Sequence, residues 1–232
     1  MTGIWVRWEC KEDNPINYGK FDKVYLIINK IVPDTIVPKD DDELLYYIYA
    51  LSAYGYKPYI CISSGHINDM EYESQLQRYS QMANIVLDYI RFEHADIKNI
   101  FKFSDVNTRV KLAKYYCDKY NRELDMAVRI FPGNFLVGQN YWDMQKYGTI
   151  LPMIYPEDCF GGNAKLANDK NFKAIKFHKW LFPKCEICLQ AWTTLENGTY
   201  APRQKEHLDR EMEYLGNDYS IFRWYWYKKG LK

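Results

Sequence analysis

A single aspartate at the end of an apolar run is the residue of this chain best placed to do chemistry. Residues 84–87 lead into Asp88, and Arg91 follows three positions later. A run that is apolar on both faces predicts a strand buried on both sides, which is typical of parallel sheets. An ionised carboxylate at low dielectric is unfavourable unless it has a partner or a task. We therefore expect Asp88 to act as a nucleophile or base, or to form a structural ion pair with Arg91 that closes the end of the strand.

A second carboxyl group would complete a pair that can cleave a glycosidic bond. That reaction needs one carboxyl group to donate a proton and another to attack or to activate water. Glu157 follows the apolar segment 149–155 and is our candidate for the acid, with Glu9 and Asp158 as rivals. Helix capping or a solvated loop is the alternative role for Glu157 and Asp158.

Predicted strands alternate with helices and must position these groups. The strands are expected at 3–8, 23–29, 58–62, 84–93, 124–131, 149–155, 184–192 and 219–226. The helices are expected at 43–53, 72–82, 104–120, 141–146, 170–181 and 206–215. This alternation predicts a parallel α/β fold, and the number of strands favours a closed (β/α)8 barrel of the TIM type, formed by residues 1–232 as a single domain. The first strand is not followed by a Gly-x-Gly-x-x-Gly turn, which argues against a dinucleotide-binding fold.

Several polar and aromatic residues are expected to gather at one end of this barrel, because barrel active sites lie at the carboxyl ends of the strands. Besides Asp88 and Glu157, the candidates for substrate binding are Glu9, Arg91, Arg129, Tyr155, Gln190, Trp192 and Trp224. Aromatic rings beside carboxylates and amides suit a sugar ring, which stacks through an apolar face and forms hydrogen bonds through its rim. Packing within the barrel is the alternative role for each tryptophan.

Two other functions stay open. His66 and His94 could meet Asp88 in a metal site of an amide- or ester-cleaving enzyme, although no strand carries a His-x-His pair. A barrel that has lost catalysis and binds carbohydrate or assembles with a partner is the other alternative. For the hydrolase itself we expect no cofactor.

Four segments resemble a family of largely uncharacterised glycoside hydrolase-like (β/α)8 domains. They are Leu-Asp-Tyr-Ile-Arg-Phe at 87–92, Val-Gly-Gln-Asn at 137–140, Leu-Pro-Met-Ile-Tyr-Pro at 151–156 and Leu-Gln-Ala-Trp at 189–192. The similarity runs from about Ile85 to the C-terminus. The chain departs from the family at Glu93, where proline is usual, and at Glu157 and Asp158, which replace a Ser-His-like pair. The resemblance implies the barrel and a role for Asp88 more than it implies a catalytic partner.

Composition narrows the classes of partner. The formal net charge is +1, so no field favours nucleic acid or an anionic membrane. No apolar run is long enough to span a bilayer and no signal segment opens the chain, so a cytoplasmic protein is expected. The six cysteines are scattered, and Cys185 and Cys188 would point to opposite faces of a strand, so buried packing is expected for them. Many tyrosines and charges hint at a hot environment.

The first strand is expected to lie beside a thinly covered seam. The crossover after it is short and interrupted by Pro15, and only residues 227–232 follow the last predicted strand, which leaves no room for a full eighth helix. Long aromatic side chains or a second copy of the chain are expected to fill the seam, the second case giving a homodimer.

Overall fold

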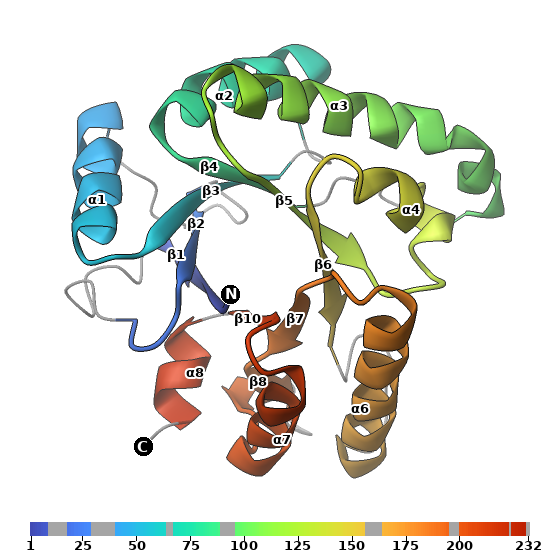
Figure 1. Cartoon of the computed structure of the whole chain (residues 1–232). Coiled ribbons are helices and arrows are strands. Elements are labelled where there is room, and N and C mark those ends of the chain that lie inside the picture. Colours follow the sequence, from blue (N-terminus) through green and yellow to red (C-terminus); the bar gives the residue numbers. More distant parts are fainter. Residues whose placement is uncertain are drawn as a thin grey trace.

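Eight parallel strands close into a barrel in the computed structural model of the chain (Figure 1). The structure describes residues 1–8, 18–28, 40–63, 67–88, 96–155, 164–194, 200–222 and 224–230. The barrel strands are β1 (Gly3–Arg7), β2 (Lys23–Ile27), β3 (Lys57–Ser63), β4 (Asn84–Asp88), β5 (Leu124–Arg129), β6 (Thr149–Ile154), β7 (Ile187–Gln190) and β10 (Tyr219–Phe222). Each strand pairs in parallel with its neighbours, and β1 closes the ring between β2 and β10. The predicted (β/α)8 class is therefore confirmed.

Helices surround the strands. The α-helices in the described part of the chain are α1 (Asp41–Ala53), α2 (Asp69–Met82), α3 (Phe103–Lys119), α4 (Tyr141–Met144), α6 (Ala164–Leu181), α7 (Lys205–Leu215) and α8 (Trp224–Gly230). Two 3-10 helices, η3 (Ile97–Lys102) and η4 (Phe135–Val137), precede α3 and α4. Side chains cap α1 and α2, since Asp40 accepts from the backbone N–H of Glu43 and Asn68 from that of Glu71, at 2.9 Å each.

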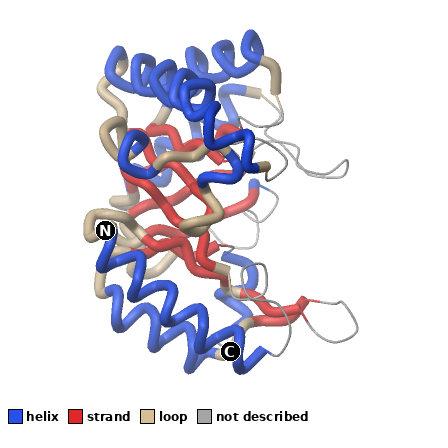
Figure 2. The backbone as a smooth tube through the Cα atoms, turned by 90° about the vertical axis from the view of Figure 1, so that its right-hand side faces the viewer, coloured by secondary structure: helices blue, strands red, loops and turns tan. Residues whose placement is uncertain are grey.

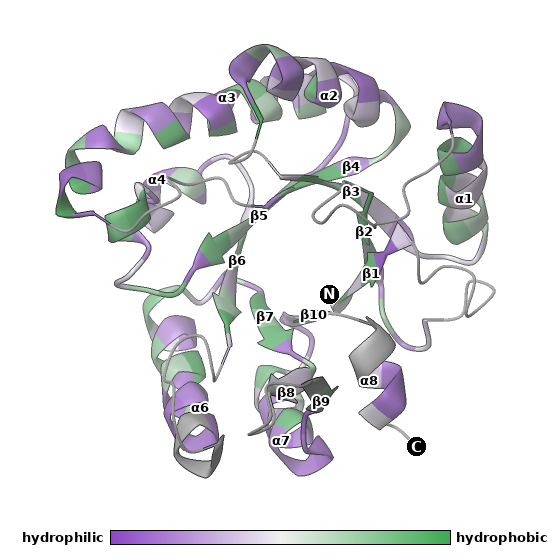
Figure 3. Ribbon diagram, turned by 180° about the vertical axis from the view of Figure 1, so that it is seen from behind, coloured by the Kyte–Doolittle hydropathy of each residue, from purple (hydrophilic) through white to green (hydrophobic). Residues whose placement is uncertain are grey.

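Alternation along the strands creates two separate cores. Residues at every second position fill the barrel, among them Trp5, Tyr25, Tyr59 and Val86. The intervening positions face the helices and join a larger outer core. Figure 3 shows this pattern as predominantly hydrophobic β5, β6 and β7 inside helices of mixed polarity. Because both faces of each strand are buried, the sequence pattern of a strand here is a continuous apolar run.

Gly3 allows close packing inside the barrel. A Cβ atom at this position would lie 2.6 Å from Cε2 of Tyr25 and 3.1 Å from Oε1 of Glu186. Real Cβ atoms essentially never show a contact as short as the one to Tyr25, so the glycine allows the first residue of β1 to approach the side chains of its neighbours without a shift.

The last strand ends earlier than expected, and a helix follows it. β10 ends at Phe222, so the expectation of a strand to Trp226 was wrong, and residues 224–230 form α8. This helix has 7 residues, which agrees with the expectation of no full eighth helix. Phe222 pairs with Gln190 and Trp5, and β7 ends at Gln190. The N–H of Ala191 still donates to the backbone oxygen of Phe222, at 3.1 Å. α8 is short and packs against β1. Its Tyr227 also contacts Phe21, which lies two residues before β2, with ring centroids 5.5 Å apart.

The seventh strand is also shorter than predicted. It spans Ile187–Gln190 instead of 184–192, and Trp192 begins a separate antiparallel hairpin of β8 (Trp192–Thr194) and β9 (Tyr200–Pro202). Figure 2 shows this hairpin projecting at the end of the barrel opposite the N-terminus.

Within the described residues, no helix is both long and apolar enough to cross a membrane.

Candidate active site

Asp88 lies where the sequence predicts, at the last position of β4. Val86 belongs to the core inside the barrel, so the alternation of the strand directs Asp88 to the same side, and its side chain is buried. Its charge acts on two thiols inside the barrel, because burial and then Asp88 raise the pKa of Cys61 and contribute to raising that of Cys188 to about 12. The carboxylate therefore faces the interior, at the carboxyl end of the strands.

Three aromatic rings pack together at the same end. Tyr155 follows β6, Trp192 follows β7 by two residues, and Phe222 ends β10. Ring centroids are 5.6 Å apart for Tyr155 and Trp192, 5.8 Å for Tyr155 and Phe222, and 5.6 Å for Trp192 and Phe222. We call Tyr155, Trp192 and Phe222 the aromatic triad. It packs on the interior core, and its offset and edge contacts are the favourable geometries for aromatic pairs.

Gln190 lies beside the aromatic triad. It is the last residue of β7, pairs in register with Phe222, and is 1% exposed. Two residues before it, Cys188 lies in the interior core, where its sulfur is 3.6 Å from the hydroxyl oxygen of Tyr155. Gln190 therefore shares the inner face of the barrel with Asp88, and Asp88, Tyr155, Gln190 and Trp192 from the predicted set lie at the same end of the barrel.

The predicted roles of Arg129 and Trp224 as substrate contacts stay predictions. Arg129 ends β5, but its side chain is exposed and lies against Gly133, where a Cβ would be 3.5 Å from Nε. Trp224 is the first residue of α8 instead of a strand end, because β10 ends at Phe222, which is its last residue paired with β7. Its side chain is outside the described part of the structure.

The remaining candidates fall on segments that the structure does not describe. They are Glu9, Arg91, Glu157, Asp158 and the two histidines of the metal alternative, His66 and His94. Among the described residues, no group of three or more His, Cys, Asp and Glu side chains could hold a metal ion. The roles predicted for these residues stay predictions.

The described cysteines and His178 have packing roles. Cys61, Cys117, Cys185 and Cys188 are free and buried, with Cys185 and Cys188 on opposite faces as predicted. His178 lies on α6, where its Nε2 accepts a hydrogen bond from the N–H of Phe131 at 3.0 Å, and burial lowers its pKa. The neutral imidazole thus ties α6 to the segment after β5.

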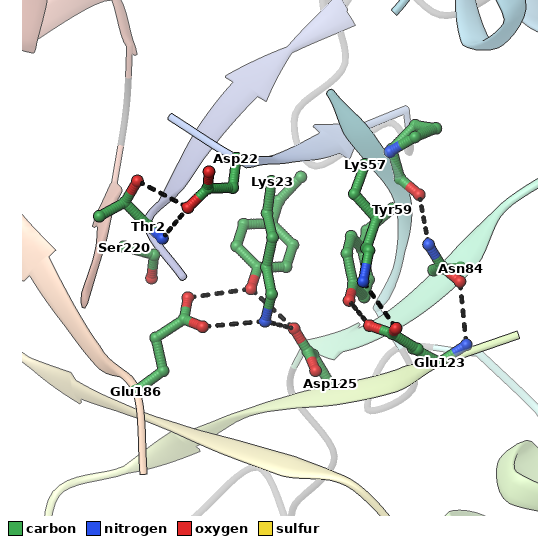
Figure 4. A network of polar contacts seen from close by, with 12 residues as sticks. Thr2, Asp22, Lys23, Lys57, Tyr59, Asn84, Glu123, Asp125, Glu186 and Ser220 are labelled. Carbon is green, nitrogen blue, oxygen red and sulfur yellow. Dashed lines mark hydrogen bonds and ion pairs between the residues drawn. The ribbon is translucent and has the colours of Figure 1, made fainter. Parts of the chain in front are cut away.

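The opposite end of the barrel holds a buried ionic group that the sequence did not reveal. Nζ of Lys23 donates to Asp125 at 2.8 Å and to Glu186 at 2.9 Å, as Figure 4 shows. The hydroxyl oxygen of Tyr25 also lies within hydrogen-bond distance of both carboxyl groups, 2.7 Å from Asp125 and 3.0 Å from Glu186. We call these four residues the polar base of the barrel, since Lys23 begins β2, Asp125 is the second residue of β5 and Glu186 directly precedes β7.

Burial and charge shift the protonation of the polar base. Burial, followed by the charge of Asp125, raises the pKa of Glu186 to about 7 against the opposing effect of Lys23. Although burial lowers the pKa of Lys23, the two carboxylates raise it overall. With Lys23 charged and Glu186 protonated the group is neutral, which suits an interior that disfavours net charge.

A second polar contact flanks the polar base. Glu123 accepts from the hydroxyl of Tyr59 and from Nζ of Lys57, the latter at 2.7 Å, and its backbone N–H donates to Asn84 at 2.9 Å (Figure 4). These contacts join β3, β4 and the start of β5. The polar base and this contact close the barrel end away from Asp88, so they are part of the scaffold rather than of the candidate site.

Two residues of the candidate site were missed in the sequence. Phe222 belongs to the aromatic triad, and Ser63 pairs in register with Asp88 and is buried. The alternation Tyr-Ser-Ile-Phe at 219–222 contains the signal for Phe222. Ser220 faces the inside of the barrel, where its Oγ accepts a hydrogen bond from Nε1 of Trp5 at 3.3 Å, and Phe222 follows two positions later on the same face of the strand. Ser63 follows the apolar run of β3 directly.

The barrel is similar to those of glycoside hydrolases of known structure. The glycoside hydrolase domain of PgaB (BpsB) from Bordetella bronchiseptica matches with a TM-score of 0.67 at 11% identity, over 95% of this chain and 93% of that one. A GH18 chitinase from Pseudoalteromonas aurantia matches with a TM-score of 0.61 at 11% identity, over 95% and 93% of the two chains. The endo-1,4-beta-D-mannanase of Thermotoga petrophila RKU-1 matches with a TM-score of 0.56 at 12% identity, over 88% and 80%. At these identities the similarity establishes the fold.

Comparison by sequence identifies no relative. No protein-family model matches the chain, and no curated protein matches it.

Proposed function

We propose that this glycoside hydrolase-like barrel cleaves glycosidic bonds of an oligo- or polysaccharide, with Asp88 as nucleophile or base. The observation that carries the proposal is the buried carboxylate at the end of β4, which faces the interior at the same end as the aromatic triad. A carboxylate and an aromatic surface together provide what a sugar needs at its cleavage point, an acid–base group and an apolar face to stack on.

Glu157 is the proposed proton donor. It follows β6 in the sequence, two residues after Tyr155 of the aromatic triad, so a side chain from this loop can approach the same end of the barrel. A separation of about 5–5.5 Å between the two carboxyl groups would make the enzyme retaining, and about 6.5–9.5 Å would make it inverting. Glu9 and Asp158 are the alternative donors, while Arg91, Arg129 and Trp224 are proposed as further contacts to the substrate.

Replacing Asp88 by Asn tests the proposal. The change keeps the size of the side chain and removes its charge, so we expect hydrolysis to fall by a factor of about 10²–10⁴. Release of reducing ends from soluble chitin and mannan derivatives measures the reaction, because a chitinase and a mannanase are among the similar structures. Glu157→Gln should reduce the rate by a similar factor if Glu157 is the donor.

Asp118→Asn is the matched control. Asp118 is an exposed carboxylate on α3 that pairs with Lys114, four residues earlier, and exposed pairs of this kind contribute little to stability. Its variant should hydrolyse at the wild-type rate. Activity that survives unchanged in Asp88→Asn would exclude Asp88 from the chemistry.

A barrel that binds carbohydrate without cleaving it is the second candidate. Among the described residues that face the interior at this end, Asp88 is the single carboxylate. Binding of an oligosaccharide without product after long incubation, unchanged by Glu157→Gln, would favour this function over hydrolysis.

A further inference from the structure

The side-chain amide of Gln190 has no hydrogen-bond partner among the described residues. Its Oε1 is fully enclosed and accepts no hydrogen bond, and the recorded bond to this residue is from Nη1 of Arg203 to its backbone oxygen at 3.4 Å. A buried polar atom without a partner makes the folded state less stable. Such atoms are uncommon, and a site for a ligand or an ordered water is a physical reason to keep one.

Two other buried amides show why Gln190 is different. Oδ1 of Asn134 and of Asn171 also lacks a partner in the described part of the chain. However, Nδ2 of Asn134 donates to the backbone oxygen of Gln139 at 2.8 Å, and Nδ2 of Asn171 donates to Glu211 at 2.9 Å. Each of these amides therefore has a structural task in the shell outside the barrel, whereas Gln190 is inside it.

The surroundings of Gln190 identify the kind of ligand. Phe222 lies beside it in register, and Cys188 and Trp192 precede and follow it on the inner face of the chain. The charge of Asp88 reaches Cys188 from across the barrel. An acceptor that shares one end of the barrel with an aromatic surface and a carboxylate fits a flat, partly apolar molecule that carries hydrogen-bond donors on its rim, which is the description of a sugar.

We infer that Gln190 determines specificity by accepting a hydrogen bond, through Oε1, from a hydroxyl or amide N–H of the sugar unit that packs on the aromatic triad. The inference rests on the proposed function and deepens it, because it selects sugars that carry a donor at this position. An analogue without the donor leaves the acceptor buried and unpaired, and sites of this type discriminate strongly against such analogues. Any water that occupies the position in the free protein would be displaced by the ligand group.

Replacing Gln190 by Met separates this role from a structural one. Methionine has nearly the same length and volume but cannot accept this hydrogen bond. We expect affinity for a bound oligosaccharide to fall by about 10-fold or more. Because the change also removes an unpaired polar atom from the free protein, we expect the unfolding temperature to stay the same or to rise by about 2–4 °C.

Cellotriose, mannotriose and chitotriose, measured by isothermal titration calorimetry, are the probes. Loss of affinity for cellotriose or mannotriose in Gln190→Met would assign the donor to a hydroxyl group. Loss confined to chitotriose would assign it to the acetamido N–H. Asn171→Leu is the matched control, since it removes a buried amide outside the barrel, and it should lower the unfolding temperature without changing any affinity.

Three results would overturn the role of Gln190. They are equal affinity of wild type and Gln190→Met, an unfolding temperature that falls in Gln190→Met as in the control, and no binding of the three trisaccharides to wild type. Hydrolysis is scored separately. If the affinity difference is found but no product forms, the proposed hydrolase function fails while the role of Gln190 is supported.

Discussion

Individual charged residues serve different purposes at the two ends of the barrel. At the carboxyl ends of the strands, Asp88 lies at the same end of the barrel as the aromatic triad and Gln190. At the opposite end, Lys23 is enclosed by Asp125 and Glu186 at distances of 2.8 and 2.9 Å. A buried ion pair of this kind is weak evidence for stability, since desolvation offsets the attraction, but removal of one partner leaves an uncompensated charge.

Glu186→Gln is expected to remove a pH-dependent loss of stability. Burial raises the pKa of Glu186 from its ordinary 4.5 to about 7, so the folded protein holds a proton that the unfolded chain releases. The contribution of this bound proton to the free energy of unfolding is therefore complete below about pH 4.5, and it is lost as the pH rises through about 7. Relative to the variant, the unfolding temperature of wild type should fall by a few degrees between about pH 5 and about pH 8.

The comparison between variants is needed because other groups titrate in the same range. Burial lowers the pKa of His178, and a buried neutral histidine makes the fold less stable as the pH falls, which is the opposite direction. Glu206→Gln, at an exposed position on α7, is the control and should give a curve parallel to that of wild type. A parallel curve for Glu186→Gln would show that Glu186 is ionised throughout.

At the scale of elements, helix starts and strand pairing determine where each segment begins and ends. α1 and α2 begin at residues whose side chains accept backbone N–H groups, Asp40 and Asn68. These N–H groups have no partner within the helix, so the capping side chain determines where the first turn of the helix begins. β10, by contrast, ends where its neighbour β7 ends, and the aromatic residues that follow it form α8.

Asn68→Ala tests the cap of α2. Loss of the 2.9 Å hydrogen bond to the N–H of Glu71 should lower the free energy of unfolding by about 0.5–2 kcal/mol. Thermal and urea unfolding measure the change, which corresponds to about 2–4 °C for each kcal/mol in a chain of this size. Asn68→Asp should retain the stability, and Gln77→Ala, at an exposed position within the same helix, should leave it unchanged. An unchanged Asn68→Ala variant would show that the cap is not needed.

At the scale of the whole molecule, the barrel closes between its first and last strands. Gly3, Ile4 and Trp5 of β1 pair with Ser220, Ile221 and Phe222 of β10. α8 and the contacts of Phe21 with Tyr219 and Tyr227 cover part of this closure. Aromatic side chains or a second copy of the chain were expected to fill this seam, and Phe21, Tyr219 and Tyr227 cover the part of it that the structure describes.

A homodimer through the same seam stays a prediction. Sedimentation velocity over a range of concentrations measures the mass in solution. If the seam is the interface, Lys229→Glu on the exposed side of α8 should shift the equilibrium between monomer and dimer, whereas Lys98→Glu on η3 should not. A wild-type protein that sediments as a monomer at every concentration would exclude the dimer.

The sequence alone determined the order and type of the main elements and the place of Asp88. Both follow from local patterns: apolar runs mark strands buried on both faces, and helical spacing marks α1, α3 and α7. Local patterns also placed Tyr155, Gln190 and Trp192 near strand ends, although Trp192 lies in a hairpin.

Only the tertiary structure decided which distant residues meet. The partners of Lys23 in the polar base are 102 and 163 residues away in the chain, and nothing in the neighbourhood of any of them marks the contact. The end of β10 coincides with the end of its neighbour β7, which lies elsewhere in the chain. Oε1 of Gln190 is unpaired because no described side chain donates a hydrogen bond to it. Pairing and burial are properties of the closed barrel, because each requires strands from both halves of the chain.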